Sequence, residues 1–264
     1  MKNKILKIKD NIYAVRGIWL WHFSFFPTYC YIIQNKKNGE IILIDTCGPG
    51  SSHLIKEAIE IMGGKATDIT AIALTHWHQD HTGSICEIAT MIGKREKPLK
   101  IFIHYRDADF LISQKLRWLN IHPFLKIKVC HKPGKLPSNE LYELVPFGNS
   151  NNNPLSSYGI DFIHSPGHTP GHSAYLYKED GILFSGCGLS ILGKKTVGIV
   201  PVFYNRKEQI ESAKKLAQMD FKYLYPAHLY LNHKEISKGK RVACNQKSFI
   251  NRIFGSLPLF KYMD

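Results

Sequence analysis

The chain has 264 residues, of which 44% are hydrophobic and 21% charged, a composition typical of globular proteins that excludes a disordered chain. Thirty-five basic residues against 21 acidic ones give a net charge of +14. This charge suits a nucleic acid, an anionic membrane surface or an anionic substrate and does not choose among them. Much of the excess is lysine scattered singly, which is typical of a solvated surface.

The first 15 residues carry charges every few positions and no uninterrupted apolar run, so they do not predict a signal peptide. Residues 17–33 are apolar but contain His22 and Pro27, and they are too short for a membrane span. None of the six cysteines forms a CxxC pair, which indicates free thiols in a reducing compartment. We therefore expect a cytoplasmic protein without a membrane partner. The cysteines are Cys30, Cys47, Cys86, Cys130, Cys187 and Cys244.

In the first half of the chain, strands are predicted where Ile, Val and Tyr are concentrated. A helix is predicted from a cap at Ser51 or Ser52 to about Met62, because its apolar residues recur on one face and two glycines follow it. A second helix follows the His-rich loop at 75–83. The predicted strands are 8–15, 29–34, 41–45, 69–74 and 99–104, and the later helices are 84–92 and 107–119.

The second half begins with residues 121–158, which are rich in Pro, Asn and Ser and predict no regular element. The strands expected after them are 160–164, 173–177, 182–185 and 223–225, and a helix is expected over 205–219. Strands thus come in two clusters, each followed by helices. This order predicts two sheets packed together with helices outside, and no linker divides the chain.

One segment carries the chemistry: residues 75–81 read THWHQDH and place four metal-capable side chains within six positions. Imidazole nitrogen and carboxylate oxygen are both good zinc ligands. A tight turn after an apolar strand can direct such side chains toward one point, so this loop can face two adjacent metals. Buried histidines rarely cluster this densely without a metal or a switch role.

The motif HxHxDH after an apolar strand resembles the signature of the metallo-β-lactamase superfamily. Four further stretches resemble superfamily segments in the same order: IILIDTCG at 41–48, SPGHTPGH at 165–172, ILFSGCG at 182–188 and YPAH at 225–228. The resemblance covers about residues 5–230. It implies an α/β fold, a four-layer αββα sandwich with two mixed β-sheets flanked by helices, and a single domain over residues 1–264.

The resemblance also implies two zinc ions as cofactors. Carried over by position, His76, His78 and His168 hold the first ion, and Asp80, His81 and His228 hold the second. Cys187 departs from the pattern, because most of the superfamily has a bridging Asp there. One subclass of β-lactamases has Cys at this place but lacks the histidine after the motif's Asp. We expect a thiolate ligand of the second metal; the alternative is a buried, inert thiol.

The function implied is hydrolysis by a metal-activated hydroxide that attacks a carbonyl group of a lactone, thioester or β-lactam. Asp80 is the expected catalytic residue, because its second oxygen can orient the nucleophile. Asp45 either supports a ligating histidine or caps a turn. His172 either supports the site or contacts substrate, with simple loop packing as the alternative.

Substrate contacts are expected from an alternating aromatic face with Trp19, Trp21 and Phe23. This face either lines the site or belongs to the core or to a homodimer contact. Lys194 and Lys195 either meet a substrate anion or are simply solvated. The expected partner is a small-molecule substrate.

Three other functions are alternatives to hydrolysis of a small carbonyl compound. The charge favours a nuclease or phosphodiesterase of the same fold; the 41 positions from Cys187 to His228 leave no room for the extra domain of the larger nucleases, so the alternative is one of the smaller tRNA-end nucleases. Iron-dependent redox relatives usually carry Glu at the place of His78. A nearly full ligand set argues against a non-catalytic metal-binding module. No specific nucleic acid is expected.

Overall fold

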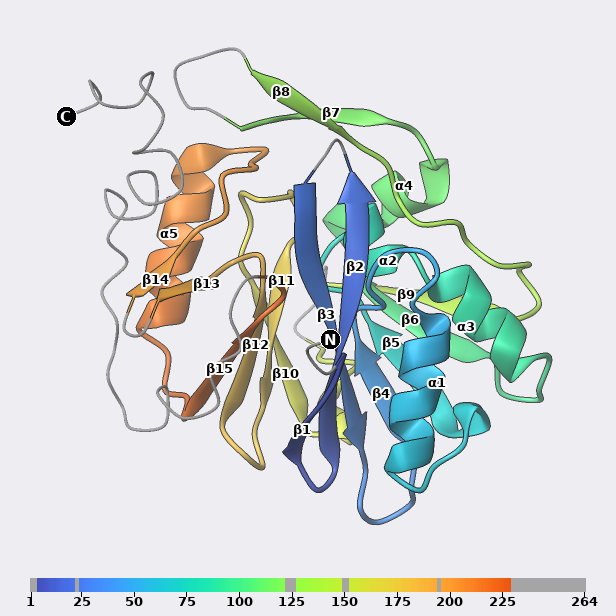
Figure 1. Cartoon of the computed structure of the whole chain (residues 1–264). Helices are drawn as coiled ribbons and strands as arrows, with labels where there is room; N and C mark the ends of the chain where they lie inside the picture. The colour runs from blue at the N-terminus through green and yellow to red at the C-terminus, as the bar shows by residue number, and fades with distance from the viewer. Residues whose placement is uncertain (1–3, 22–23, 122–126, 149–151, 194–195, 229–264) are drawn as a thin grey trace.

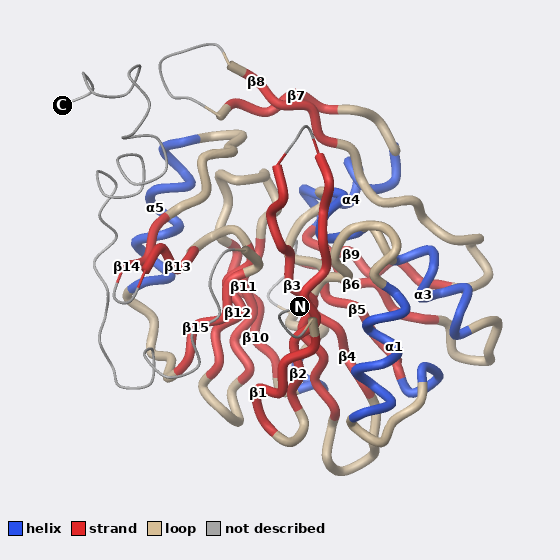
Figure 2. The backbone as a smooth tube through the Cα atoms, in the orientation of Figure 1, coloured by secondary structure: helices blue, strands red, loops and turns tan. Residues whose placement is uncertain are grey.

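The computed structural model describes residues 4–21, 24–121, 127–148, 152–193 and 196–228. Two β-sheets lie face to face, with α1, α3 and α4 outside one sheet and α5 outside the other (Figure 1). The tube in Figure 2 shows the strands of both sheets concentrated in the middle of the molecule and the helices at its sides. This is the four-layer αββα arrangement predicted from the sequence.

The first sheet has seven strands in the order β1-β2-β3-β4-β5-β6-β9. Strands β1 to β4 pair antiparallel, whereas β4, β5, β6 and β9 are parallel. The sheet is therefore mixed, as expected. Its strands are β1 (Ile5–Lys9), β2 (Ile12–Trp21), β3 (Ser24–Gln34), β4 (Ile41–Ile44), β5 (Ile69–Ala73), β6 (Leu99–His104) and β9 (Tyr142–Phe147).

The second sheet has four strands in the order β10-β11-β12-β15. The first three are antiparallel neighbours, and β15 pairs parallel with β12. Its strands are β10 (Ile160–His164), β11 (Ser173–Tyr177), β12 (Ile182–Gly186) and β15 (Tyr223–Pro226). The parallel pair brings the ends of β12 and β15 to the same edge, which places the segments after both strands next to each other.

The helices cover the outer faces because each has one apolar side. In α1, Leu54, Ile55, Ala58 and Ile59 are buried against the first sheet. In α5, Ala213 and Leu216 are buried against the second sheet. The helices are α1 (Ser52–Ile61), α2 (Gln79–Thr82), α3 (Ile85–Ile92), α4 (Tyr105–Ser113) and α5 (Arg206–Ala217), with short 3₁₀ turns η1 (Ala66–Asp68) and η2 (Ser156–Tyr158).

The core between the two sheets is rich in aromatic side chains. Tyr31 of the first sheet lies 4.8 Å, centroid to centroid, from Phe184 of the second. Burying such a side chain contributes about 1.5–3 kcal/mol. At one edge the sheets are also joined through the backbone, because the Ser173 amide donates to the Thr75 carbonyl at 2.9 Å. This edge carries the His-rich loop, so the segment bearing the predicted ligands is fixed to both sheets.

Four element predictions were wrong or incomplete. The helix expected over 107–119 ends at Ser113, where Gln114 takes a left-handed conformation with φ 52°. Residues Arg117–Asn120 then form strand β7, which pairs antiparallel with β8 (Lys128–His131). The strand expected over 8–15 is divided between β1 and β2 by a turn. Residues 121–158, where no element was predicted, contain β8, β9 and η2, and the short hairpin of β13 (Ser190–Gly193) and β14 (Thr196–Gly198) was also missed.

The helix expected from Ser51 or Ser52 begins at Ser52, although the Ser51 side chain makes no capping hydrogen bond. The described cysteines, Cys30, Cys47, Cys86, Cys130 and Cys187, are all free thiols, and Cys244 lies outside the described residues. Within the described part of the chain, the helices are all too short or too polar to cross a membrane.

Candidate metal centre

All seven side chains predicted as metal ligands lie together at the edge where the strand ends of both sheets meet. His76 and His78 follow β5, and Asp80 and His81 lie on the short helix α2. The other three follow β10, β12 and β15 of the second sheet, and they are His168, Cys187 and His228. The site is thus shared between the two sheets.

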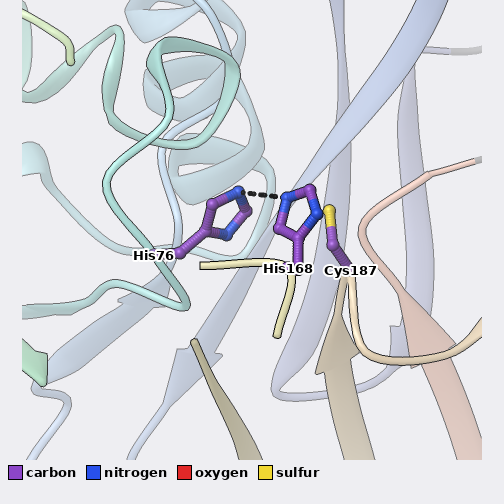
Figure 3. A group of neighbouring side chains, drawn as sticks. All are labelled: His76, His168 and Cys187. Carbon is purple, nitrogen blue, oxygen red and sulfur yellow. Dashed lines mark hydrogen bonds between the residues drawn. The ribbon is translucent and has the colours of Figure 1, made fainter. Parts of the chain in front are cut away.

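One half of the centre is formed by three buried imidazoles. His76 Nε2 lies 3.0 Å from His78 Nδ1 and 3.1 Å from His168 Nε2. Figure 3 shows the rings of His76 and His168 directed toward each other, with the Cys187 sulfur beside His168. His76, His168 and the Cys187 sulfur lie within 4.8 Å of one another, and His78 borders His76, so these side chains are close enough to hold a metal ion.

The other half has a mixed donor set. His81 Nε2 lies 3.3 Å from His228 Nε2 and 3.6 Å from Cys187 Sγ. Asp80 Oδ2 lies 3.4 Å from His81 Nε2 and 3.3 Å from His228 Nε2. Nitrogen, oxygen and sulfur donors therefore converge on a second point, and these are the donor types that zinc accepts.

The outward-facing ring nitrogens show that these histidines are prepared to bind a cation. His168 Nδ1 donates to the Val202 carbonyl at 2.8 Å, and His228 Nδ1 donates to the Pro27 carbonyl at 3.2 Å. Since a carbonyl can only accept, each inward Nε2 is left with a lone pair when the imidazole is neutral. Lone pairs facing one another at 3.1 Å repel unless a proton or a metal ion lies between them. The residues present therefore fit a metal centre.

Burial and neighbouring charge both act on the groups of the centre. Burial lowers the pKa of His76 and of His78 well below the usual range, which favours the neutral ring that binds metal. Although burial by itself raises the pKa of the Cys187 thiol, His168 and His228 lower it well below its usual range. Burial also opposes the charge on His228, but Cys187 and Asp80 raise its pKa to about 10. The centre thus holds two anionic side chains against its imidazoles.

Asp45 lies behind the ligand loop, in the position suggested for a supporting carboxylate. Its Oδ2 lies 2.7 Å from His81 Nδ1 and accepts from the Thr75 hydroxyl at 2.8 Å, and its Oδ1 accepts from the Thr75 amide at 2.7 Å. The residue is buried, and its φ of 59° is in the left-handed region, which is strained for a side chain other than glycine. This conformation places the carboxylate where it orients His81.

We expect Asp45→Ala to weaken the second metal about 10- to 100-fold, because a carboxylate that orients a ligating imidazole contributes that much to affinity. The first metal should change little, since the histidines of that half do not contact Asp45. Zinc titration against a competing chelator measures both affinities. Asp109→Ala, which removes an exposed carboxylate on α4, is the control. Equal affinities in Asp45→Ala and the parent chain would contradict this role.

His172 is fully buried, and both of its ring nitrogens face protein groups. Nδ1 lies 2.9 Å from the Ser165 hydroxyl, and Nε2 accepts from the Cys187 amide at 3.0 Å. This geometry favours support of the loop bearing Cys187 over contact with substrate. The turn is tight, because a side chain at Gly186, which has φ 54°, would clash with His172 and Thr75.

Two residues of the site were missed from the sequence. Asp107 of α4 accepts from the Thr169 hydroxyl and from the Gly171 amide, each at 2.6 Å, and thereby holds the loop of His168. Its burial raises the carboxyl pKa to about 7. Asp107 could have been found from its position in the sequence, because it follows a predicted strand closely and the ends of parallel strands form the edge of a sheet where binding sites lie. The other residue, His131 of β8, lies in the segment where no element was predicted.

The proposed substrate contacts are not located by the structure. The backbones of Trp19 and Trp21 belong to β2 and pair with Phe26 and Ser24 of β3, but their side chains lie outside the described part. Phe23, Lys194 and Lys195 lie outside the described residues. These assignments remain predictions.

Comparison with known proteins agrees with the fold and the centre. The model of the metallo-beta-lactamase superfamily matches residues 24–228. The chain belongs to this superfamily. Membership identifies it as a hydrolase of a metal-binding superfamily whose ions are typically zinc. The residues that carried the resemblance in the sequence, from the HxHxDH loop to the last histidine, all lie within the matched range.

Among curated relatives, YobT of Bacillus subtilis, described as uncharacterized, is 29% identical over 214 residues, which are 75% of this chain and 83% of YobT. A hydroxyacylglutathione hydrolase of Shewanella loihica is 26% identical over 78% of this chain and 64% of its own length. Several other curated relatives are likewise covered over only about half to two thirds of their length. Among solved structures, a metallo-beta-lactamase from Pontibacter korlensis aligns with a TM-score of 0.60 at 16% identity, covering 88% of this chain and 94% of that one; this likeness shows the fold.

Proposed function

We propose that the protein is a dinuclear zinc hydrolase that acts on a carbonyl substrate. His76, His78 and His168 would hold one ion, and Asp80, His81, His228 and Cys187 the other. The observation that carries this proposal is the convergence of seven donor side chains, from loops of both sheets, on two adjacent points. We further propose that the substrate is a small molecule and that the chain acts as one domain.

When bound, the two ions would lower the pKa of a water molecule toward neutrality and polarise the substrate carbonyl. The protein's part is to position the donors and one carboxylate. Asp80 Oδ2 faces His81 and His228, which leaves its other oxygen to orient the attacking water and accept its proton. Asp45, Asp107 and His172 hold the ligand loops rigid, because each is buried and hydrogen-bonded to them.

Within carbonyl substrates, we favour a thioester over a lactone or a β-lactam. The support is the relative named hydroxyacylglutathione hydrolase, since its identity extends over 78% of this chain. The solved β-lactamases resemble the chain in fold at lower identities, between 16% and 22%, so their substrate is not carried over to this chain. Because the net charge of +14 would suit a polyanionic substrate, a phosphodiester is the second substrate class to test.

The test is elemental analysis of the zinc-reconstituted protein followed by a substrate panel. We expect about two zinc ions per chain, as the donor set of the two points requires. The panel should contain a thioester, a lactone, a β-lactam and a precursor tRNA at physiological salt, and we expect the thioester to be hydrolysed fastest. One metal per chain that added zinc does not change would contradict the dinuclear centre, and efficient RNA cleavage would replace the carbonyl substrate by a phosphodiester.

A further inference from the structure

His131 adds an imidazole to the centre that is not among the seven donors. Its ring lies 4.0 Å, centroid to centroid, from that of His78, at an interplanar angle of 23°. A nitrogen of His131, a nitrogen of His78 and an oxygen of Asp80 all lie within 4.8 Å of one another. The residue therefore borders both halves of the proposed centre, although it comes from the β7–β8 hairpin and not from a ligand loop.

The hairpin is firmly attached at this place. Leu119 is buried in the core with Val129 packed against it. Asn120 exchanges two backbone hydrogen bonds with Phe203, of 3.1 and 2.8 Å, and the neighbouring Val202 carbonyl accepts from His168. The hairpin is thus joined to the segment that orients His168, a proposed ligand. This contact fixes the position of His131 relative to the centre.

The chain just after β8 is fixed as well. The Gly134 amide donates to the Thr82 hydroxyl at 2.7 Å, and a side chain at Gly134 would clash with the Thr82 backbone. Thr82 is the last residue of α2, the helix that carries Asp80 and His81. Because His131 is fixed through β7 on one side and through Gly134 on the other, its place beside Asp80 is built into the fold.

The exposed side of the centre contains this histidine. His76, His78, His81, His168 and Cys187 are buried, whereas His131 is only partly buried, and the side chains of Asp80 and His228 keep 14% and 15% exposure. Of the donors and His131, the side chains that keep contact with solvent are therefore Asp80, His228 and His131. Of these three, His131 is the one not needed as a ligand.

The hairpin that carries His131 is basic, while the Asp80 carboxylate lies near the ring on the side of the centre. Residues 115–135 contain six Lys or Arg and no Asp or Glu. Among them, the exposed Arg117 pairs directly with His131 across the two strands and lies on the same face, whereas the exposed Lys128 lies on the opposite face of β8. A cluster of one sign raises the local concentration of ligands of the opposite sign, and an imidazole N–H can donate to a carboxylate once such a ligand is bound.

We propose that His131 is a specificity-determining residue that binds a carboxylate of the substrate next to the scissile carbonyl. The inference rests on the proposed function for the scissile group, but the contact itself does not depend on turnover. It names the substrate class as an acyl compound that carries a second, anionic group.

Binding of two small thiols to the zinc-loaded protein tests the contact without catalysis. Mercaptoacetate and 2-mercaptoethanol share a thiol that binds zinc, but only the first carries a carboxylate. We expect mercaptoacetate to bind more tightly to the parent chain, and His131→Ala to reduce that preference about tenfold, as expected for one hydrogen bond to a charged group. His131→Gln, which keeps a donor, should restore part of it. Titration calorimetry gives both affinities.

The matched control is Cys130→Ala. Its side chain points to the opposite face of β8, so the preference and the zinc content should stay as in the parent. Loss of one zinc ion in His131→Ala would overturn the proposal by making His131 a ligand, and an unchanged thiol preference would overturn it by making the histidine a packing residue. Kinetics add a separate arm: His131→Ala should raise KM for a succinyl thioester, not for a butyryl thioester. If the parent chain hydrolyses neither, the proposed thioester activity fails, whereas the thiol measurement still decides the role of His131.

Discussion

His76→Ala is expected to abolish hydrolysis and to remove most of the metal bound at the first point. The reason is geometric, because His76 Nε2 lies 3.0 Å from His78 Nδ1 and 3.1 Å from His168 Nε2. Removal of the central imidazole leaves two donors facing an empty volume. Loss of a residue that only orients a ligand weakens metal binding about 10- to 100-fold, so loss of the ligand itself should exceed that range. Zinc content and kcat/KM are the two measurements.

The control for this variant is His53→Ala, which removes an exposed histidine from α1 and should leave both quantities unchanged. Circular dichroism separates loss of metal from loss of fold. His78→Ala should behave like His76→Ala, because the two rings face each other. A His76→Ala protein that is folded, keeps two metals and retains activity would show that these imidazoles form a structural cluster without a catalytic metal.

The ligand loops could be predicted from sequence because each is a local pattern at the end of a strand. THWHQDH at 75–81 follows the apolar strand β5, and Cys187 follows β12. An apolar run that ends in polar, metal-capable residues can be recognised from neighbouring positions alone, without knowledge of the rest of the chain. The same holds for the strands themselves, since β6, β10 and β11 have the predicted bounds 99–104, 160–164 and 173–177.

The β7–β8 hairpin could not be predicted because its stability is not local. The sequence predicts that residues 117–119 belong to the preceding helix, over 107–119. They form a strand because Arg117 and Trp118 pair with His131 and Cys130, more than ten residues further on. Arg117 also lies over the Phe110 ring, 5.1 Å from its centroid. These contacts cannot be predicted from neighbouring residues in the sequence, and His131 was missed for the same reason.

The tie between the two sheets is a second feature that only the structure supplies. Asp107 on α4 holds the loop of His168, and His172 on that loop accepts from the Cys187 amide. A side chain at Gly171 would clash with Asp107, so the loop approaches α4 closely. Support therefore passes from the first sheet's helix to the ligands of the second sheet. Each contact joins residues distant in sequence, and periodicity carries no information about such pairs.

Cys187 is expected to be a thiolate ligand of the second metal, and its replacement should affect the second metal far more than the first. The sulfur lies 3.6 Å from His81 Nε2 and groups with His81 and His228 as a set of three donors, although it also lies within 4.8 Å of donors of His76 and His168. The tight turn at Gly186 and the hydrogen bond from the Cys187 amide to His172 fix the direction of the side chain. A thiolate ordinarily binds one zinc ion and does not bridge two, which would leave the bridge to water.

Three measurements follow for Cys187. The cobalt-substituted protein should show a thiolate-to-metal charge-transfer band in the near ultraviolet, which Cys187→Ser removes. Alkylation of the metal-free protein should prevent recovery of activity when zinc is added back, and zinc bound beforehand should protect the thiol. Cys187→Asp should keep two metals, because a carboxylate is also a good zinc ligand, whereas Cys187→Ser should lose most of the second. Cys86→Ser, which replaces a cysteine of α3 away from the centre, is the matched control.

The alternative is an inert, buried thiol at a lost ligand position, and it gives different results in each measurement. Cys187 is 1% exposed, so burial alone suits either role. An inert thiol would leave the cobalt spectrum without a sulfur band, and Cys187→Ala would keep both metals and full activity. In that case the second ion would be held by Asp80, His81 and His228. The Oδ2 atom of Asp80 and the Nε2 atoms of the two histidines lie within 3.4 Å of one another. A ligand role instead requires Cys187→Ala to lose the second ion even though these three donors are intact, because the thiolate would be one of the groups that hold it.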